Sequence, residues 1–131
     1  MTLEEAMALQ PEWVMMWVYV LVAGAFVAPV VLLIWKASRK AGIITLVASL
    51  LAGFGVQMIF DAMGYVKLLG LPHLILWVPI VVFLMAQQAR GDMTNWPRRI
   101  IWFIIAIICI SLVFDFIDVA RWILGERAPL V

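Results

Sequence analysis

The sequence predicts an all-α membrane protein with four transmembrane helices. Of its 131 residues, 67% are hydrophobic and 13% are charged, whereas an ordinary soluble domain has about 45–50% and 25%. A soluble chain of this size leaves about a third of its unfolded surface in water, so this excess of apolar side chains requires lipid. The apolar residues also form four long runs separated by short polar breaks, which is the pattern of a polytopic membrane protein.

The lengths of these runs indicate where the helices lie. A helix needs about 20 residues to cross the hydrocarbon core. The uncharged stretches are residues 13–35, 41–60, 68–89 and 100–114. The last is short, and it spans the membrane only if the helix continues through Asp115 and Asp118. We therefore expect a single transmembrane domain over residues 1–131, with helices at about 11–36, 42–66, 71–90 and 96–122.

Prolines mark helix starts and predict two kinks. Pro11, Pro72 and Pro97 lie where proline can occupy the first turn of a helix. Pro29 and Pro79 lie inside the predicted spans. Because proline has no backbone N–H, we expect kinks at these two positions.

The charges of the polar breaks predict the orientation of the chain. The first and third breaks carry Lys36, Arg39, Lys40, Arg90, Arg98 and Arg99. The N-terminal segment, the second break and the C-terminal segment carry Lys67, Arg121 and Arg127. The positive-inside rule then predicts an antiparallel bundle in a plasma membrane or bacterial inner membrane, with both termini outside the cytoplasm. The first residues are acidic rather than basic, so we do not expect a cleaved signal peptide.

The second predicted helix carries polar and small residues at intervals of four: Thr45, Ser49, Gly53, Gln57, Asp61 and Tyr65. Neighbours at this spacing lie on one slowly drifting face. One interpretation is a polar path for water that leads to Asp61. The other is a seam where small residues such as Gly53 let two helices approach closely, and this second interpretation is the one we favour.

The fourth predicted helix places Ser111, Asp115 and Asp118 on one face, with Arg121 one turn further. One interpretation is structural: Asp118 pairs with Arg121, and Asp115 meets Lys67 or His73. A second is a vestibule for cations or protons, because carboxylates at membrane depth often mark ion pathways. A third is a divalent metal site, although no known ligand spacing is present.

Other chemistry has little support in the sequence. His73 is the only histidine, so it could relay a proton, but the chain by itself cannot supply two histidines to a haem. Cys109 is the only cysteine, which excludes an intrachain disulfide. No nucleophile triad, phosphate-binding loop or strongly basic surface is indicated. We therefore expect no enzyme activity, no catalytic residues, no metal, no cofactor and no nucleic-acid partner.

The resulting functional hypothesis is a small oligomeric channel or transporter for cations or protons with an acidic outer vestibule. Its predicted pathway residues are Asp61, Asp115, Asp118, Arg121, Gln57, Tyr65 and His73. The alternative is a non-catalytic accessory or assembly subunit of a larger membrane complex. The expected partners are the lipid bilayer, further copies of the chain and, in the alternative, that larger complex.

Overall fold

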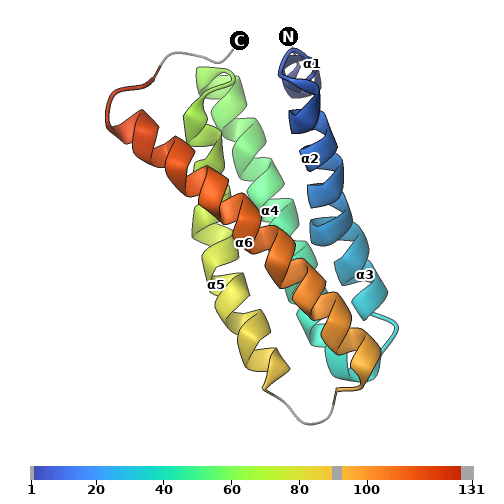
Figure 1. Ribbon diagram of the computed structural model, residues 1–131. Coiled ribbons are helices and arrows are strands. Elements are labelled where there is room, and N and C mark those ends of the chain that lie inside the picture. Colours follow the sequence, from blue (N-terminus) through green and yellow to red (C-terminus); the bar gives the residue numbers. More distant parts are fainter. Residues whose placement is uncertain (1, 90–92, 128–131) are drawn as a thin grey trace.

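The computed structural model describes residues 2–89 and 93–127, and every regular element in these residues is a helix (Figure 1). Four helical stretches are long and apolar enough to cross a membrane: Glu12–Leu32, Lys36–Met63, Lys67–Gln88 and Asn95–Ile123. The predicted helical class and the number of candidate spans are thereby confirmed. The predicted end of the third helix at residue 90, and the charge of Arg90, lie outside the described residues.

The first span follows a short helix, α1 (Leu3–Ala8), and consists of α2 (Glu12–Val22), the π-helical segment η1 (Ala23–Val27) and α3 (Ala28–Leu32). The π-helical turn lies immediately before Pro29. There the amide of Ala28 donates to the carbonyl of Ala23, five residues earlier. A wider turn of this kind adapts the backbone to a proline that cannot donate its own hydrogen bond.

The second span consists of the 3₁₀ turn η2 (Lys36–Ser38) and α4 (Arg39–Met63). The buried Ser38 hydroxyl donates to the carbonyl of Leu32 at 2.8 Å, which fastens the turn between α3 and α4. Next to this turn the two helices are very close, because a Cβ on Gly42 would lie 2.5 Å from the Pro29 carbonyl oxygen. Helix α4 ends at Gly64, whose φ of 81° suits glycine.

The third and fourth spans are η3 (Lys67–Gly70) with α5 (Leu71–Gln88), and α6 (Asn95–Ile123). A reciprocal pair of hydrogen bonds joins the end of α5 to the start of α6. The guanidinium of Arg98 donates to the Gln88 carbonyl at 2.7 Å, and the Gln88 amide donates to the Arg98 carbonyl at 2.8 Å. Helix α6 continues without a break through Asp115 and Asp118, as a membrane span requires.

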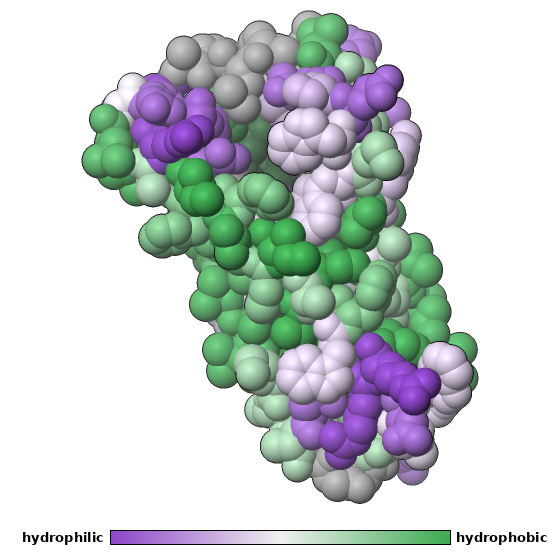
Figure 2. All heavy atoms as spheres, in the orientation of Figure 1, coloured by the Kyte–Doolittle hydropathy of each residue, from purple (hydrophilic) through white to green (hydrophobic). Residues whose placement is uncertain are grey.

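The core lies where α6 packs against the other spans (Figure 1). Its largest members include Leu32, Trp77, Leu84, Ile104 and Ile108, all of which are nearly inaccessible. Many large apolar side chains remain exposed on the outer faces, and Figure 2 shows a hydrophobic belt between two more hydrophilic ends. This distribution is the one expected of a chain that presents its outer faces to lipid.

The two hydrophilic ends differ in charge. The terminal end, as we name it, contains α1, the start of α2, the C-terminal end of α4, η3 and the C-terminal end of α6 (Figure 1). All described acidic residues belong to it: Glu4, Glu5, Glu12, Asp61, Asp115, Asp118 and Glu126. The opposite end, named the loop end, contains η2, the end of α5 and the start of α6. Its described charged residues are all basic: Lys36, Arg39, Lys40, Arg98 and Arg99.

The polar and small residues that recur at intervals of four along α4, which we name the polar stripe, do not stay on one side of the helix. Thr45 and Ser49 are buried, whereas Gly53, Gln57 and Asp61 are exposed. With 3.6 residues per turn, each step of four residues rotates the position by about 40°, so the stripe turns through roughly 160° between residues 45 and 61. Small residues form a seam only in its first part. The expectation that Gly53 packs closely is wrong within this chain, because a Cβ there would meet nothing within 4 Å.

Candidate functional site

The sharpest polar arrangement lies at the terminal end, where η3 crosses α6. A Cβ on Gly70 would be 3.0 Å from the Cα, Cβ and Oδ1 of Asp115. A side chain at residue 70 would therefore require α6 to shift by a few tenths of an ångström, so the absence of a Cβ favours this close crossing. The close approach holds Asp115 against the first turn of α5, the turn that carries His73.

Asp115 has polar neighbours from two helices. The Ser111 hydroxyl, one turn earlier on α6, donates to Asp115 Oδ2 at 3.3 Å. The Nδ1 atom of His73 lies 3.8 Å from the same oxygen, a separation too long for a hydrogen bond but short enough for an ion pair when the imidazole is protonated. Both side chains retain some access, with exposed fractions of 16% for Asp115 and 22% for His73.

His73 extends this arrangement into the core. Its ring lies over the ring of Trp77, with centroids 4.6 Å apart and an interplanar angle of 48°. The Trp77 indole N–H donates to the Ser49 hydroxyl of α4 at 3.2 Å. A continuous set of contacts thus runs from Asp115 on α6 through α5 to α4, and it fixes the rotation of these three helices.

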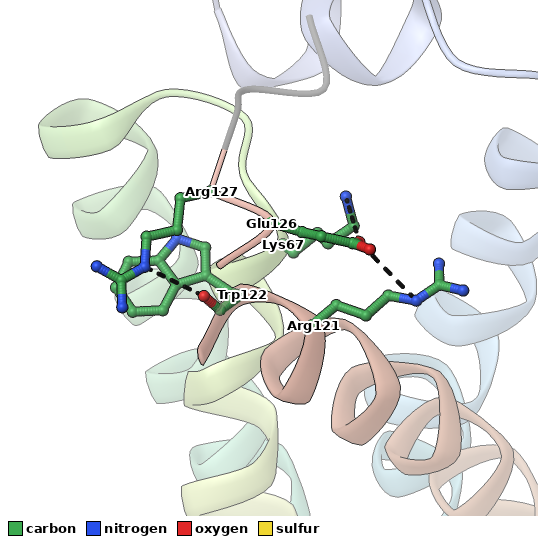
Figure 3. A network of polar contacts seen from close by, with 5 residues as sticks. All are labelled: Lys67, Arg121, Trp122, Glu126 and Arg127. Atoms are coloured by element: carbon green, nitrogen blue, oxygen red, sulfur yellow. Dashed lines mark hydrogen bonds and ion pairs between the residues drawn. The ribbon is translucent and has the colours of Figure 1, made fainter. Parts of the chain in front are cut away.

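The terminal end of α6 is fastened to η3 by Glu126, as Figure 3 shows. The Glu126 carboxylate lies 3.7 Å from Lys67 Nζ and 4.0 Å from Arg121 Nε. Arg127 stacks on the Trp122 ring, 4.4 Å from its centroid, and donates to the Trp122 carbonyl at 3.2 Å. Glu126 and Arg121 are mostly exposed, so we expect these ion pairs to contribute orientation more than stability.

Two adjoining cavities open beside Asp115 and Asp118. The larger has a volume of about 450 Å³ and the smaller about 180 Å³. Both are lined by Val18, Tyr65, Lys67, His73, Asp115 and Asp118, and the larger also reaches Ser111 and Arg121. One wall of the larger cavity is aromatic, where the rings of Trp13 and Trp17 lie 6.3 and 6.1 Å from that of Phe114. A solute in this space would meet both carboxylates.

Tyr65 supplies a neutral hydroxyl to both cavities. Burial raises the pKa of this hydroxyl above its ordinary value, and the negative charge of Asp118 raises the pKa further. The hydroxyl therefore keeps its proton at neutral pH and is available as a hydrogen-bond donor.

The structure brings together five of the seven predicted pathway residues and separates the other two. Tyr65, His73, Asp115, Asp118 and Arg121 line the larger cavity. Gln57 and Asp61 do not line either cavity. They are exposed on α4, where the Gln57 amide donates to Asp61 Oδ1 at 2.9 Å. The rotation of the α4 stripe explains this separation.

The ion pairs also differ from the structural interpretation of the sequence in one respect. Asp115 lies beside His73, as that interpretation allowed, but Arg121 pairs with Glu126 rather than with Asp118. Within the described part of the chain, Asp118 interacts electrostatically with Lys67 and Arg121 but makes no ion pair at contact distance. Sequence reasoning did not identify Glu126 as the link. Its position five residues after Arg121, beyond the helix end, gave no periodic signal.

A metal centre is not assembled in the part of the chain that the structure describes. Within residues 2–89 and 93–127, no group of three or more His, Cys, Asp or Glu side chains is placed to hold a metal ion. The carboxylates and the imidazole can hold protons or a weakly bound cation instead. Neither a protein-family model, nor a curated protein, nor a solved structure matches this chain.

Proposed function

We propose that this protein is a small channel or transporter that admits monovalent cations or protons through the acidic cavity at its terminal end. In this proposal the four spans form an antiparallel bundle, kinked at Pro29 and Pro79, in a plasma membrane or bacterial inner membrane. The basic loop end faces the cytoplasm, and both termini face outward. Several copies assemble, because four helices alone enclose too little volume for a complete path.

The observation that supports this proposal is the charge around the larger cavity. Asp115 and Asp118 line it, and Glu126 binds the two basic residues that also line it, Lys67 and Arg121. Three carboxylates against two permanent cations leave one excess negative charge while the imidazole of His73 is neutral. A partly buried site disfavours an uncompensated charge, so one proton or one monovalent cation would complete it.

The arrangement also offers a place for a proton to move. Asp115 is hydrogen-bonded to Ser111 and lies 3.8 Å from the imidazole of His73. Imidazole and carboxylate groups exchange protons readily. A small approach of the two side chains would bring them to hydrogen-bond distance, and the cavity beside them has room for water. The same groups can therefore hold either a proton or a monovalent cation.

The test is ion flux into liposomes that contain the purified protein, under an imposed membrane potential, with H⁺, Na⁺ and K⁺ compared. Asp115→Asn and Asp118→Asn should each abolish most of the flux, because either change removes the excess charge. Asp61→Asn is the matched control, since Asp61 is an exposed acid at the same end but outside the cavities, and it should leave flux unchanged.

A fourth variant separates transport from structure. Lys67→Gln removes a positive charge from the cavity wall, so the cavity should hold a cation more often and the cation flux should change. If the ion pairs around the cavity are purely structural, Lys67→Gln should only lower the stability of the protein. Wild-type flux equal to that of empty liposomes, with folded and correctly oriented protein, would refute the proposal. An accessory role in a larger membrane complex would then be the better explanation.

A further inference from the structure

An apolar groove on the lipid-facing side of the loop end is separate from the acidic cavities. It has a volume of about 390 Å³ and lies between the first span and the start of α6. Its lining residues are Ala23, Val27, Ala28, Val31, Trp96, Arg99, Ile100 and Phe103. At a rise of about 1.5 Å per residue, the eight steps from Ala23 to Val31 make the groove roughly 12 Å long. This space accommodates about a dozen groups the size of a water molecule, at about 30 Å³ each.

Small side chains create the groove. Ala23 and Ala28 present only a methyl group each to the groove. Between these two positions the first span and α6 come close enough that a Cβ on Gly24 would lie 2.8 Å from a methyl carbon of Ile107. The groove therefore runs from the loop end along the first span to Ala23, and it lies beside the close contact between Gly24 and α6. An extended hydrocarbon chain that enters from the loop end fits this shape.

Arg99 is the only charged residue among those that line the groove. Its guanidinium lies over the Trp96 ring, 5.5 Å from the centroid, and both residues belong to the first turns of α6. The neighbouring Arg98 has a different role, because its guanidinium donates hydrogen bonds to the carbonyls of Gln88 and Met93. One arginine thus joins α5 to α6, while the other adds a positive charge to an apolar groove.

The surroundings favour an anionic ligand. All described charged residues of the loop end are basic, and tryptophan rings in membrane proteins typically lie at the level of the lipid headgroups. A second apolar groove, of about 350 Å³ between α4 and α5, has no charged residue in its lining. Of these two grooves, the first combines a space for an acyl chain with a cation for a phosphate, and the second does not.

We propose that this groove binds one anionic phospholipid, with an acyl chain along Ala23, Val27 and Phe103 and the headgroup phosphate on Arg99. Arginine suits this role, since its planar guanidinium donates two parallel hydrogen bonds to phosphate oxygens. The site does not depend on cation transport, because it shares no residue with the acidic cavities.

Native mass spectrometry of the purified protein tests this proposal, with phosphatidylglycerol or phosphatidylcholine of identical chains added in detergent. Wild-type protein should retain one phosphatidylglycerol molecule per chain in preference to phosphatidylcholine. Arg99→Gln should reduce this preference about fivefold, the effect expected of one basic residue near an anionic headgroup. Lys40→Gln, which removes an exposed charge from the same end outside the groove, should not change it.

A second pair of variants tests the acyl-chain part. Val27→Trp fills the groove from a position that is 56% exposed and should lower retention of both lipids. Val30→Trp makes the same change at a neighbouring position that is 50% exposed but outside the lining, and should have no effect. Equal losses in Arg99→Gln and Lys40→Gln, or full retention in Val27→Trp, would overturn the proposal. Wild-type protein that retains no lipid, together with fewer chains per assembly in Val27→Trp than in Val30→Trp, would overturn the proposal and assign the groove to a second copy.

Discussion

Gly42 and Gly53 lie about three turns apart on α4, and alanine should be tolerated at only one of them. At Gly42 the new Cβ would lie 2.5 Å from the Pro29 carbonyl oxygen and 3.0 Å from Leu32 Cβ. Both distances are well below an ordinary contact, so α3 and α4 must move apart by several tenths of an ångström or more. At Gly53 the new Cβ would meet nothing within 4 Å.

The expected difference in unfolding free energy between the two variants follows from two opposing contributions. Alanine in a helix interior is more favourable than glycine by about 0.5–1 kcal/mol, and this gain is common to both positions. Overpacking a tight contact costs about 1–3 kcal/mol and applies only at Gly42. Gly42→Ala should therefore be less stable than Gly53→Ala by about 1–3 kcal/mol, and Gly53→Ala should equal or exceed the wild type.

The assay is unfolding in mixed micelles with increasing sodium dodecyl sulfate, followed by far-ultraviolet circular dichroism. Equal midpoints for the two variants would refute the reasoning, because they would mean that α3 and α4 do not cross at Gly42. Gly53→Leu extends the test, since it should leave the monomer stable. Loss of an oligomer in Gly53→Leu alone would place Gly53 at a contact between copies.

Three further predictions concern the terminal end and the orientation. Gly70→Ala should lower the unfolding free energy by about 1–2 kcal/mol in the same assay, because its Cβ would press on the backbone of Asp115 at 3.0 Å. Trp77→Phe should cost about 1 kcal/mol through the lost hydrogen bond to Ser49, and in a Ser49→Ala background the same change should cost clearly less. A single cysteine at Lys40, with the native cysteine replaced by serine, should react with an impermeant thiol reagent only after cells are permeabilised; labelling of intact cells would reverse the orientation.

The helical class and the four candidate spans could be predicted because they depend on local properties. The thickness of the hydrocarbon core sets the length of an apolar helix, and a chain that must satisfy its backbone hydrogen bonds in lipid has few alternatives to helices. The same reasoning required α6 to continue through Asp115 and Asp118, and the helix does so. None of these conclusions needs knowledge of which helices touch.

The neighbours of each polar side chain were decided by the tertiary structure. The spacing of the α4 stripe was visible in the sequence, but its rotation out of the core depends on how α4 is turned against α5, where Ser49 meets Trp77. In the same way, the link of Glu126 to both Lys67 and Arg121 depends on where the chain turns after α6. Periodicity describes one helix at a time, so it cannot give these contacts.

Sequence alone thus determined that this chain is helical and has four segments able to cross a membrane, since hydrophobicity and length act within each segment. Only the tertiary structure decided that Asp115 lies beside His73 in a cavity while Asp61 remains exposed on α4. The physical reason is that close helix crossings are set by contacts between residues far apart in sequence. Two such crossings are the close approach of Gly42 to the Pro29 carbonyl and that of Gly70 to Asp115. Each of these contacts depends on a partner residue that no local sequence pattern identifies.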